Sequence, residues 1–193
     1  MKTLQLCLLA MLSGLALGRP GIAQATHVLS SAGPRFGVLY LTDPVTRGRL
    51  QDYATAKDAN AKVSPVLTAL GWQFEYEYLN TDGGSTGLIE LVPLVVGLES
   101  GLALPSVNMI IGVRFPSGFE LGFGPSASTG VKTTIENAGT PQETRSEKTS
   151  FGVGMAGVVG ITMRAGKMDF PVNLAIVRNE NGYRASLLFG WTL

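Results

Sequence analysis

The chain has 193 residues, a net charge of +1, one Cys, one His and 25 Gly, and only 15 % of its residues are charged. The near-zero net charge argues against a nucleic-acid-binding protein. A charged fraction below the roughly 25 % of soluble domains, with abundant Gly and no helical periodicity, argues against an α/β enzyme. The composition therefore favours a β-barrel or a β-sandwich.

The first 25 residues have the features of a secretory signal peptide. Lys2 is followed by the apolar run Leu4–Leu17, and the small residues of Ala23–Ala25 form a cleavage site. The run of about 14 apolar residues is shorter than the roughly 20 that a membrane-spanning helix needs. We therefore expect a signal peptide over residues 1–25 and one β-barrel domain over residues 26–193.

Eight segments of the remaining chain alternate between apolar and polar residues, which predicts strands. The clearest alternation places Trp72 and Phe74 on one face and Glu75 and Glu77 on the other. The expected strands are Phe36–Thr42, Val66–Leu79, Gly87–Glu99, two strands that pair across Pro116–Gly118, Phe151–Arg164, Asp169–Val177 and Tyr183–Leu193. This count predicts an all-β, eight-stranded, antiparallel up-and-down barrel.

Pro93 lies within the third expected strand. Proline has no N–H to donate to a sheet, so we expect this residue at a β-bulge or on an edge.

Two connections between the expected strands are long and polar. Val45–Ser64 has a composition that allows a short surface helix near Leu50–Ala59, and Ser126–Ser150 has the composition of a loop. In an up-and-down barrel both connections lie at the end opposite the chain termini. Outer-membrane barrels have this asymmetry, although a soluble barrel could have it by chance.

Glycines share a face with the charged residues of the strands, whereas bulky apolar residues occupy the other face. Small residues suit the crowded interior of an eight-stranded barrel, and bulky apolar residues suit contact with lipid. This distribution favours a membrane barrel. In the alternative, a soluble barrel, the bulky residues would fill a core or line a ligand cavity.

If the charged face points inward, its residues must compensate one another, because an isolated buried ion is costly. The expected lumen charge network consists of Glu75, Glu77, Arg114, Glu120, Arg164 and Arg184. We interpret this network as structural. A transport or ligand role is the alternative.

Other patterns give no enzyme site. Gly152–Gly157 matches a dinucleotide-binding fingerprint but lies inside an expected strand with no helix after it. His27 is the single histidine and lies next to the expected cleavage site, and Cys7 lies inside the expected signal peptide. Glu75 and Glu77 share a face but have no surrounding features of a sugar cleft. We expect no catalytic residue, no cofactor and no metal site.

The runs GWQFEYEY, LIELVPLVVGLESGLALPS, GFELGFGP, FPVNLA and SLLFGW resemble those of small, poorly characterised bacterial proteins regarded as outer-membrane β-barrels. Tyr183–Leu193 also resembles the C-terminal strand by which such barrels are handed to their assembly machinery. The resemblance implies a Gram-negative outer-membrane location, with membrane lipid and the barrel assembly machinery as partners. It assigns no functional residue.

These observations together predict a non-enzymatic outer-membrane barrel with a structural role or a surface-interaction role through its long connections. The alternative is a soluble periplasmic or secreted β-barrel that binds a small apolar ligand.

Overall fold

The computed structural model of this chain describes residues 31–136, 144–179 and 182–192, and within these ranges it describes the side chains of all residues outside 132–149. The expected signal peptide lies outside the described residues. The elements are β1 (Ser31–Leu41), α2 (Pro44–Lys57), β2 (Val66–Asn80), β3 (Thr86–Val96), the 3-10 helix η1 (Leu98–Ser100), β4 (Leu104–Arg114), β5 (Phe119–Glu136), β6 (Thr144–Ala165), β7 (Met168–Asn179) and β8 (Gly182–Gly190). No helix among the described residues is long and apolar enough to cross a membrane.

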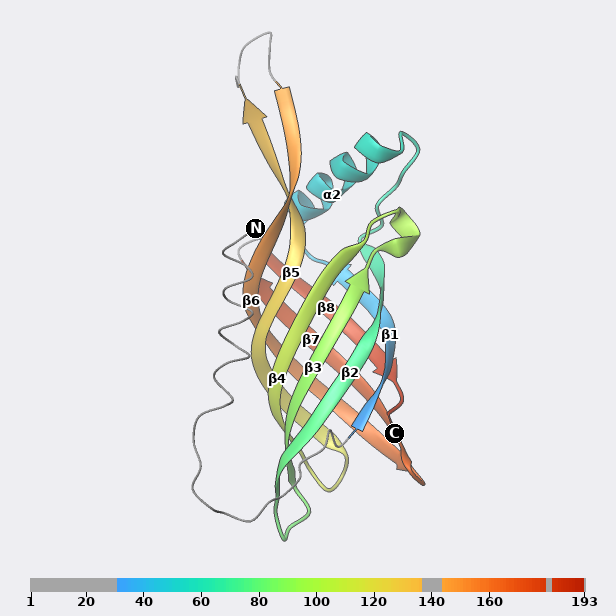
Figure 1. Ribbon diagram of the computed structural model, residues 1–193, viewed down its shortest axis with the longest axis vertical. Helices are drawn as coiled ribbons and strands as arrows, with labels where there is room; N and C mark the ends of the chain where they lie inside the picture. The colour runs from blue at the N-terminus through green and yellow to red at the C-terminus, as the bar shows by residue number, and fades with distance from the viewer. Residues whose placement is uncertain (1–30, 137–143, 180–181, 193) are drawn as a thin grey trace, which may run out of the picture.

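The eight strands form one closed barrel in the order of the sequence, which confirms the predicted fold class (Figure 1). Each strand pairs antiparallel with the next, and β1 closes the barrel by pairing with β8 from Arg35 opposite Gly190 to Leu41 opposite Arg184. The regular part of β8 ends before the predicted Leu193, but Thr192 still pairs with Asp169 of β7.

The connection between β1 and β2 contains α2, which is longer than predicted and begins earlier. Asp43 caps the helix, because its carboxylate accepts hydrogen bonds from the backbone N–H groups of Val45 at 3.2 Å and Thr46 at 2.8 Å. Pro44 occupies the first turn, where its missing N–H costs nothing. The helix therefore starts at a strong local signal that the prediction overlooked.

The prediction of a loop over Ser126–Ser150 is wrong for most of that segment. Strands β5 and β6 remain paired from Ser126 opposite Gly154 to Glu136 opposite Thr144, and the resulting hairpin projects beyond the barrel (Figure 1). The segment is polar, but its many threonines are β-branched and fit a strand. Polarity was thus a poor guide, because threonine favours strands despite its hydroxyl group.

Pro93 lies at neither a bulge nor an edge, so that prediction is also wrong. The register between β2 and β3 is the same on both sides of Pro93. Between these two paired stretches, Trp72 and Gln73 of β2 have no paired residue on β3. The register shift occurs elsewhere, between Glu77 and Leu79. On its other side Pro93 keeps its place opposite Val107 of β4.

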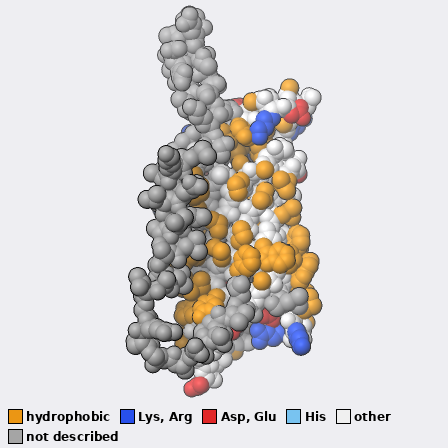
Figure 2. Space-filling model, viewed as in Figure 1, with side chains coloured by type: hydrophobic (Ala, Val, Ile, Leu, Met, Phe, Trp, Pro, Cys, Tyr) orange, Lys and Arg blue, Asp and Glu red, His pale blue; other side chains and the backbone are white. Residues whose placement is uncertain are grey.

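Large apolar side chains point outward from all eight strands. Figure 2 shows them along the length of the barrel wall, with charged side chains gathered towards the two ends of the visible face. Representatives from β1 to β8 in turn are Val38, Trp72, Leu91, Met109, Phe123, Met155, Ile176 and Phe189, all at least 42 % exposed. The bulky apolar face of the strands therefore points outward, as the sequence predicts.

The interior has two parts. Near α2, buried leucines and valines form a core that includes Leu50 and Ala54 of the helix, Leu67 and Leu94 of the strands, and Leu102 between η1 and β4. Towards the short turns, the buried residues are mostly polar or charged. Glycine relieves crowding at the wall: a Cβ on Gly124 would lie 1.9 Å from the carbonyl oxygen of Met109.

Candidate functional site: a charged network inside the barrel

Seven strands place buried polar side chains in the half of the lumen near the short turns. The alternation of each strand turns these residues inward, and none is more than 7 % exposed. They are Arg35 on β1, Gln73 and Glu75 on β2, Glu90 on β3, Arg114 on β4, Glu120 on β5, and Asn173 on β7. Thr162 on β6 joins them with the same degree of burial.

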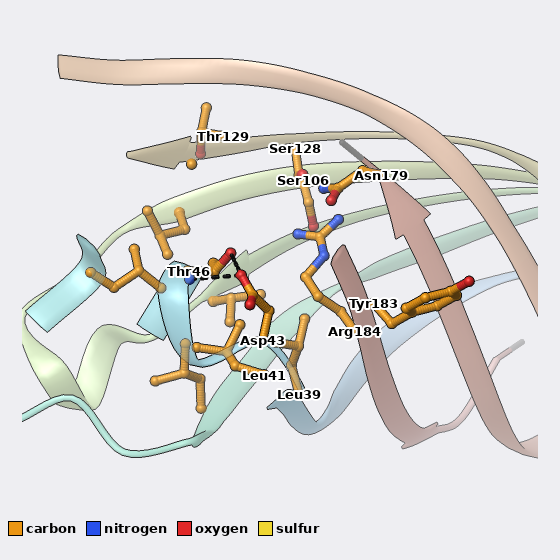
Figure 3. Close-up of a pocket in the computed structure, with 15 residues that line it drawn as sticks. Leu39, Leu41, Asp43, Thr46, Ser106, Ser128, Thr129, Asn179, Tyr183 and Arg184 are labelled. Carbon is orange, nitrogen blue, oxygen red and sulfur yellow. Dashed lines mark hydrogen bonds between the residues drawn. The ribbon is translucent and has the colours of Figure 1, made fainter. Parts of the chain in front are cut away.

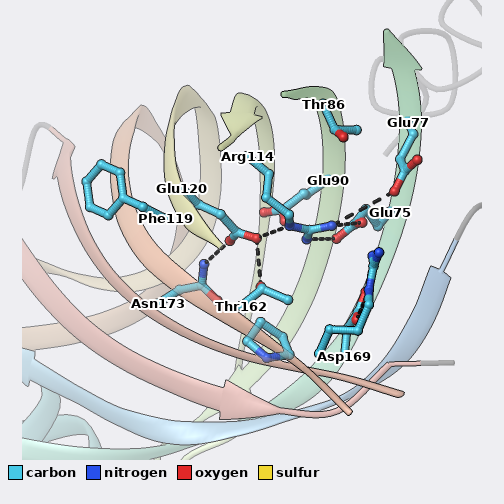
Figure 4. Close-up of polar contacts among 12 residues, drawn as sticks. Glu75, Glu77, Thr86, Glu90, Arg114, Phe119, Glu120, Thr162, Asp169 and Asn173 are labelled. Carbon is cyan, nitrogen blue, oxygen red and sulfur yellow. Dashed lines mark hydrogen bonds and ion pairs between the residues drawn. The ribbon is translucent and has the colours of Figure 1, made fainter. Parts of the chain in front are cut away.

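Arg114 is the centre of the network (Figure 4). Its Nη1 and Nη2 atoms donate to the two carboxylate oxygens of Glu75 at 2.9 and 2.7 Å, which is a bidentate ion pair. Its Nε atom donates to Glu120 on the other side. One guanidinium group therefore joins carboxylates from two other strands.

The Glu120 carboxylate has further donors on β6 and β7, the next two strands around the barrel. Thr162 donates its hydroxyl at 2.7 Å and Asn173 donates its amide at 3.1 Å. These contacts satisfy the oxygens of Glu120 without a second cation, as a buried carboxylate requires. The contacts also link β5 to β6 and β7 through side chains.

A second arginine extends the network towards the middle of the barrel. The Nε atom of Arg35 donates to the side-chain oxygen of Gln73 at 2.6 Å, and its Nη1 donates to the carbonyl of Pro171 at 3.2 Å. The amide of Gln73 then donates to Glu75 at 3.0 Å and to Glu90 at 2.9 Å. Gln73 thus connects Arg35 to Arg114 through the carboxylate of Glu75.

The network holds three buried glutamates and two buried arginines, so it carries one negative charge in excess when all five are ionised. Glu90 accepts its hydrogen bond from the neutral amide of Gln73 and not from an arginine, and it interacts with the charge of Arg35 without a direct ion pair among the described contacts. This asymmetry makes Glu90 the least compensated acidic group of the network.

The sequence-predicted residues divide into those that join the network and those that do not. Glu75, Arg114 and Glu120 are at its centre, and a carboxylate oxygen of Glu77 lies 3.9 Å from Nη1 of Arg114. Arg164 lies at the turn end, where its side chain is 66 % exposed and pairs with Asp169 at 2.8 Å. Arg164 is separated from the network by its position along the barrel axis. The alternation of residues predicts which face of the strand a side chain occupies, but it does not predict how far along the barrel the side chain lies.

Arg184 also lies outside the network, near the other end of the barrel. It occupies β8 next to Leu41 of β1, above the apolar core. The expected grouping of Arg164 and Arg184 with the other four residues is therefore corrected by the structure, which places these two arginines near opposite ends.

Sequence reasoning missed Arg35 and gave no role to Gln73, Glu90, Thr162 or Asn173. Arg35 was overlooked because the first strand was predicted to start at Phe36, although the inward positions of β1 continue backward through it. Glu90 was visible as the single acidic residue of an otherwise apolar strand interior. A search for polar residues on inward faces would have found the set.

The network has the chemistry of a structural cluster. Its charged groups are paired by hydrogen bonds and hold neighbouring strands together, and a polar cavity of about 480 Å³ brings solvent to it from the turn end. Among the described residues, no group of three or more His, Cys, Asp or Glu side chains is arranged to hold a metal ion.

Comparison with protein-family models found no match, and comparison with curated protein sequences found none either. Among solved structures, the chain is similar to Ail, the attachment invasion locus protein of Yersinia pestis, with a TM-score of 0.47 and 10 % identity over 86 % of this chain and 100 % of that one. Ail in complex with the heparin analogue sucrose octasulfate gives a TM-score of 0.42 and 13 % identity over 84 % of this chain and 98 % of that one. At this level of similarity the comparison supports no conclusion about function. The conclusions therefore rest on the strand pairing and side-chain positions of this chain.

Proposed function

We propose that the protein is a non-enzymatic β-barrel of the outer membrane, with a structural or surface-interaction role. One observation supports this most strongly: the outer wall is apolar and the inner wall holds the charges. Phe123 is 65 % exposed on the outside of β5, whereas Glu120 on the same strand is 5 % exposed. A soluble barrel that binds an apolar ligand would have the opposite arrangement.

The two ends of the barrel support an orientation. The short turns after β2, β4 and β6 share one end with the C-terminus, and the other end has α2, η1 and the β5–β6 hairpin (Figure 1). Outer-membrane barrels have short periplasmic turns and longer outer connections. The end with α2 would therefore face outward, and the C-terminal strand would meet the barrel assembly machinery.

The filling of the lumen supports a role other than transport. The charged network lies across one half of the interior and the leucine-rich core fills the other half below α2. The cavity left between them, lined by Arg35, Gln73 and Glu90 among others, has a free volume of about 30 Å³. That is room for a few water molecules, not for a solute.

The surface that remains for a partner is the outward end. Helix α2 exposes charged side chains there, including Arg47, Asp52 and Lys57. Together with the projecting hairpin, this end offers a polar surface that is held in place by the barrel. We assign the surface-interaction role to it.

Location is tested by fractionating the native protein from a Gram-negative host. The protein should be found with outer membranes and should need detergent to stay in solution. Protease added to intact cells should cut near α2 or in the β5–β6 hairpin, while the turn at residues 81–85 stays protected. Recovery from the soluble periplasm without detergent would contradict the proposal.

A matched pair of variants tests the membrane contact directly. Phe123→Arg should hinder folding into lipid bilayers, because an arginine facing lipid near the midplane costs roughly 2–4 kcal/mol. Leu98→Arg is the control, since Leu98 is 49 % exposed in η1 beyond the strand ends. Equal folding of both variants would speak for an outer wall that meets water.

The closed lumen is tested by conductance. Purified protein in planar lipid bilayers should give no steady ion current. A defined single-channel current would show an open lumen and would favour transport over the proposed role.

A further inference from the structure

A cavity lies between α2 and the upper part of the barrel wall. Figure 3 shows it with side chains from β1, α2, β4, β5, β7 and β8 around it. Its free volume is about 40 Å³, which is room for roughly three water-sized groups. Most of its lining is apolar and includes Leu39, Leu41, Leu50 and Leu104.

Arg184 is the cationic residue of this cavity. Its guanidinium group reaches toward the side chains of Ser106, Ser128 and Asn179 in Figure 3. The Nε atom is buried and has no hydrogen-bond partner in the described structure. A guanidinium N–H that is buried without an acceptor is costly, and an anion in this cavity would supply that acceptor.

The acidic residue that lines the same cavity does not compensate Arg184. The carboxylate of Asp43 is used by α2, where it accepts from the N–H groups of Val45 and Thr46 and from the Thr46 hydroxyl at 2.7 Å. No ion pair between Asp43 and Arg184 is present among the described residues, which contain ion pairs elsewhere. The helix cap therefore leaves the guanidinium available to a ligand.

We propose that this cavity is a binding site for a small organic anion. The carboxylate or phosphate group of the ligand would pair with the guanidinium of Arg184, which is suited to planar, two-oxygen acceptors. The hydroxyls of Ser106 and Ser128 would donate to the remaining oxygens. A short aliphatic part would lie against Leu39 and Leu41, where the wall is apolar.

The proposal can be tested with the full chain folded in a non-ionic detergent, whatever its location in the cell. NMR titrations would use three probes: propionate, inorganic phosphate and neutral 1-propanol. We expect propionate to shift the Nε–H signal of Arg184 and to bind more tightly than phosphate, and 1-propanol to leave the signal unchanged. Tighter binding of phosphate would overturn the role of the apolar wall.

Arg184→Gln should weaken propionate binding about 10- to 100-fold, as expected for the loss of a charged hydrogen bond. The matched control is Arg178→Gln, because Arg178 is exposed at the same end and stacks on the outside over Tyr183, 5.5 Å from its ring. That variant should bind as the unchanged protein does. If Arg184→Gln does not fold, the neutral variant Arg184→Met takes its place, together with the titration of the Arg184 Nε–H signal in the unchanged protein.

Two results would overturn the proposal. One is the absence of any saturable shift at Arg184 with both anions, which would mean that the guanidinium is simply hydrated. The other is unchanged propionate affinity in Arg184→Gln, or in Arg184→Met where Arg184→Gln does not fold, which would place the anion elsewhere.

Discussion

In the half of the lumen near the short turns, two arginines and three glutamates share one hydrogen-bonded network, whereas under α2 the interior is packed with leucine and valine. The apolar half is stabilised by removal of surface from water, which has no preferred direction. The polar half is stabilised only if each donor meets its acceptor. The two halves should therefore respond differently to the same kind of mutation.

The difference follows from what surrounds each half. Below α2 the barrel has a helix to cover its mouth, so apolar side chains from the wall find apolar partners on Leu50 and Ala54. At the turn end the polar cavity admits solvent next to Arg114 and Glu77. Charged side chains at that end can keep one side in a polar environment while they cross-link the strands.

The largest effect is expected from Arg114→Ala, since it leaves Glu75 and Glu120 facing each other without their shared cation. Breaking a buried ion pair in this way costs roughly 3–5 kcal/mol. Urea unfolding in detergent micelles would measure it. The triple variant Arg114→Met, Glu75→Gln, Glu120→Gln should regain much of the loss; no regain would mean that the charges are solvated.

In the apolar half, Leu67→Ala should cost about 2–5 kcal/mol, because Leu67 is 0 % exposed and its removal leaves a cavity in a packed core. The same unfolding assay applies. The loss of unfolding free energy in Leu67→Ala should not depend on pH or salt, in contrast to the loss in Arg114→Ala. A loss of stability in Leu67→Ala that changes with salt would show that the apolar core and the charged network are energetically coupled.

Within the network, Glu120→Gln and Glu90→Gln should differ. Glu120 accepts from Arg114, Thr162 and Asn173, so neutralising it should cost about 1.5–3 kcal/mol. Glu90→Gln should leave stability unchanged or raise it, because Glu90 is buried and accepts no hydrogen bond from an arginine among the described contacts, so neutralising it breaks no direct ion pair. Equal losses in the two variants would refute this ranking.

Arg164→Ala should have a small effect, at most about 1 kcal/mol, because the Arg164–Asp169 pair is at the exposed end. This variant is a control for Arg114→Ala, as both remove one arginine from an ion pair. A loss as large as that of Arg114→Ala would mean that exposure does not separate the two pairs.

The smallest effect concerns Asp43, whose pKa is held below its ordinary value of 3.8 by hydrogen bonds from the Thr46 side chain and backbone. Its contribution to α2 is thus fully present above that value and is lost as the pH falls through the lowered pKa of the folded state. Hydrogen-exchange protection of α2 should therefore stay constant at pH values above 3.8 and decrease as the pH is lowered below that value. In Asp43→Asn, which keeps a capping oxygen, the decrease should disappear.

Much of the fold could be predicted from the sequence, because the alternation of residues such as Trp72 and Glu75 reflects the two faces of a strand directly. Strand number, chain order and the inward direction of Arg114 and Glu120 all depend on this local property. The helix near residue 50 was also predicted, although its start at Pro44 required the cap of Asp43 to be noticed. Local signals therefore determine what each segment is.

Only the tertiary structure decided which inward residues meet. Register sets the height of each residue in the barrel, and no local signal gives it, because strand pairing depends on all eight strands closing together. Arg164, Arg184 and Arg114 have the same inward sense in the sequence, yet they lie in an exposed pair, an apolar cavity and a buried network. Closure of the barrel, through the pairing of β1 with β8, is what gives identical side chains these three environments.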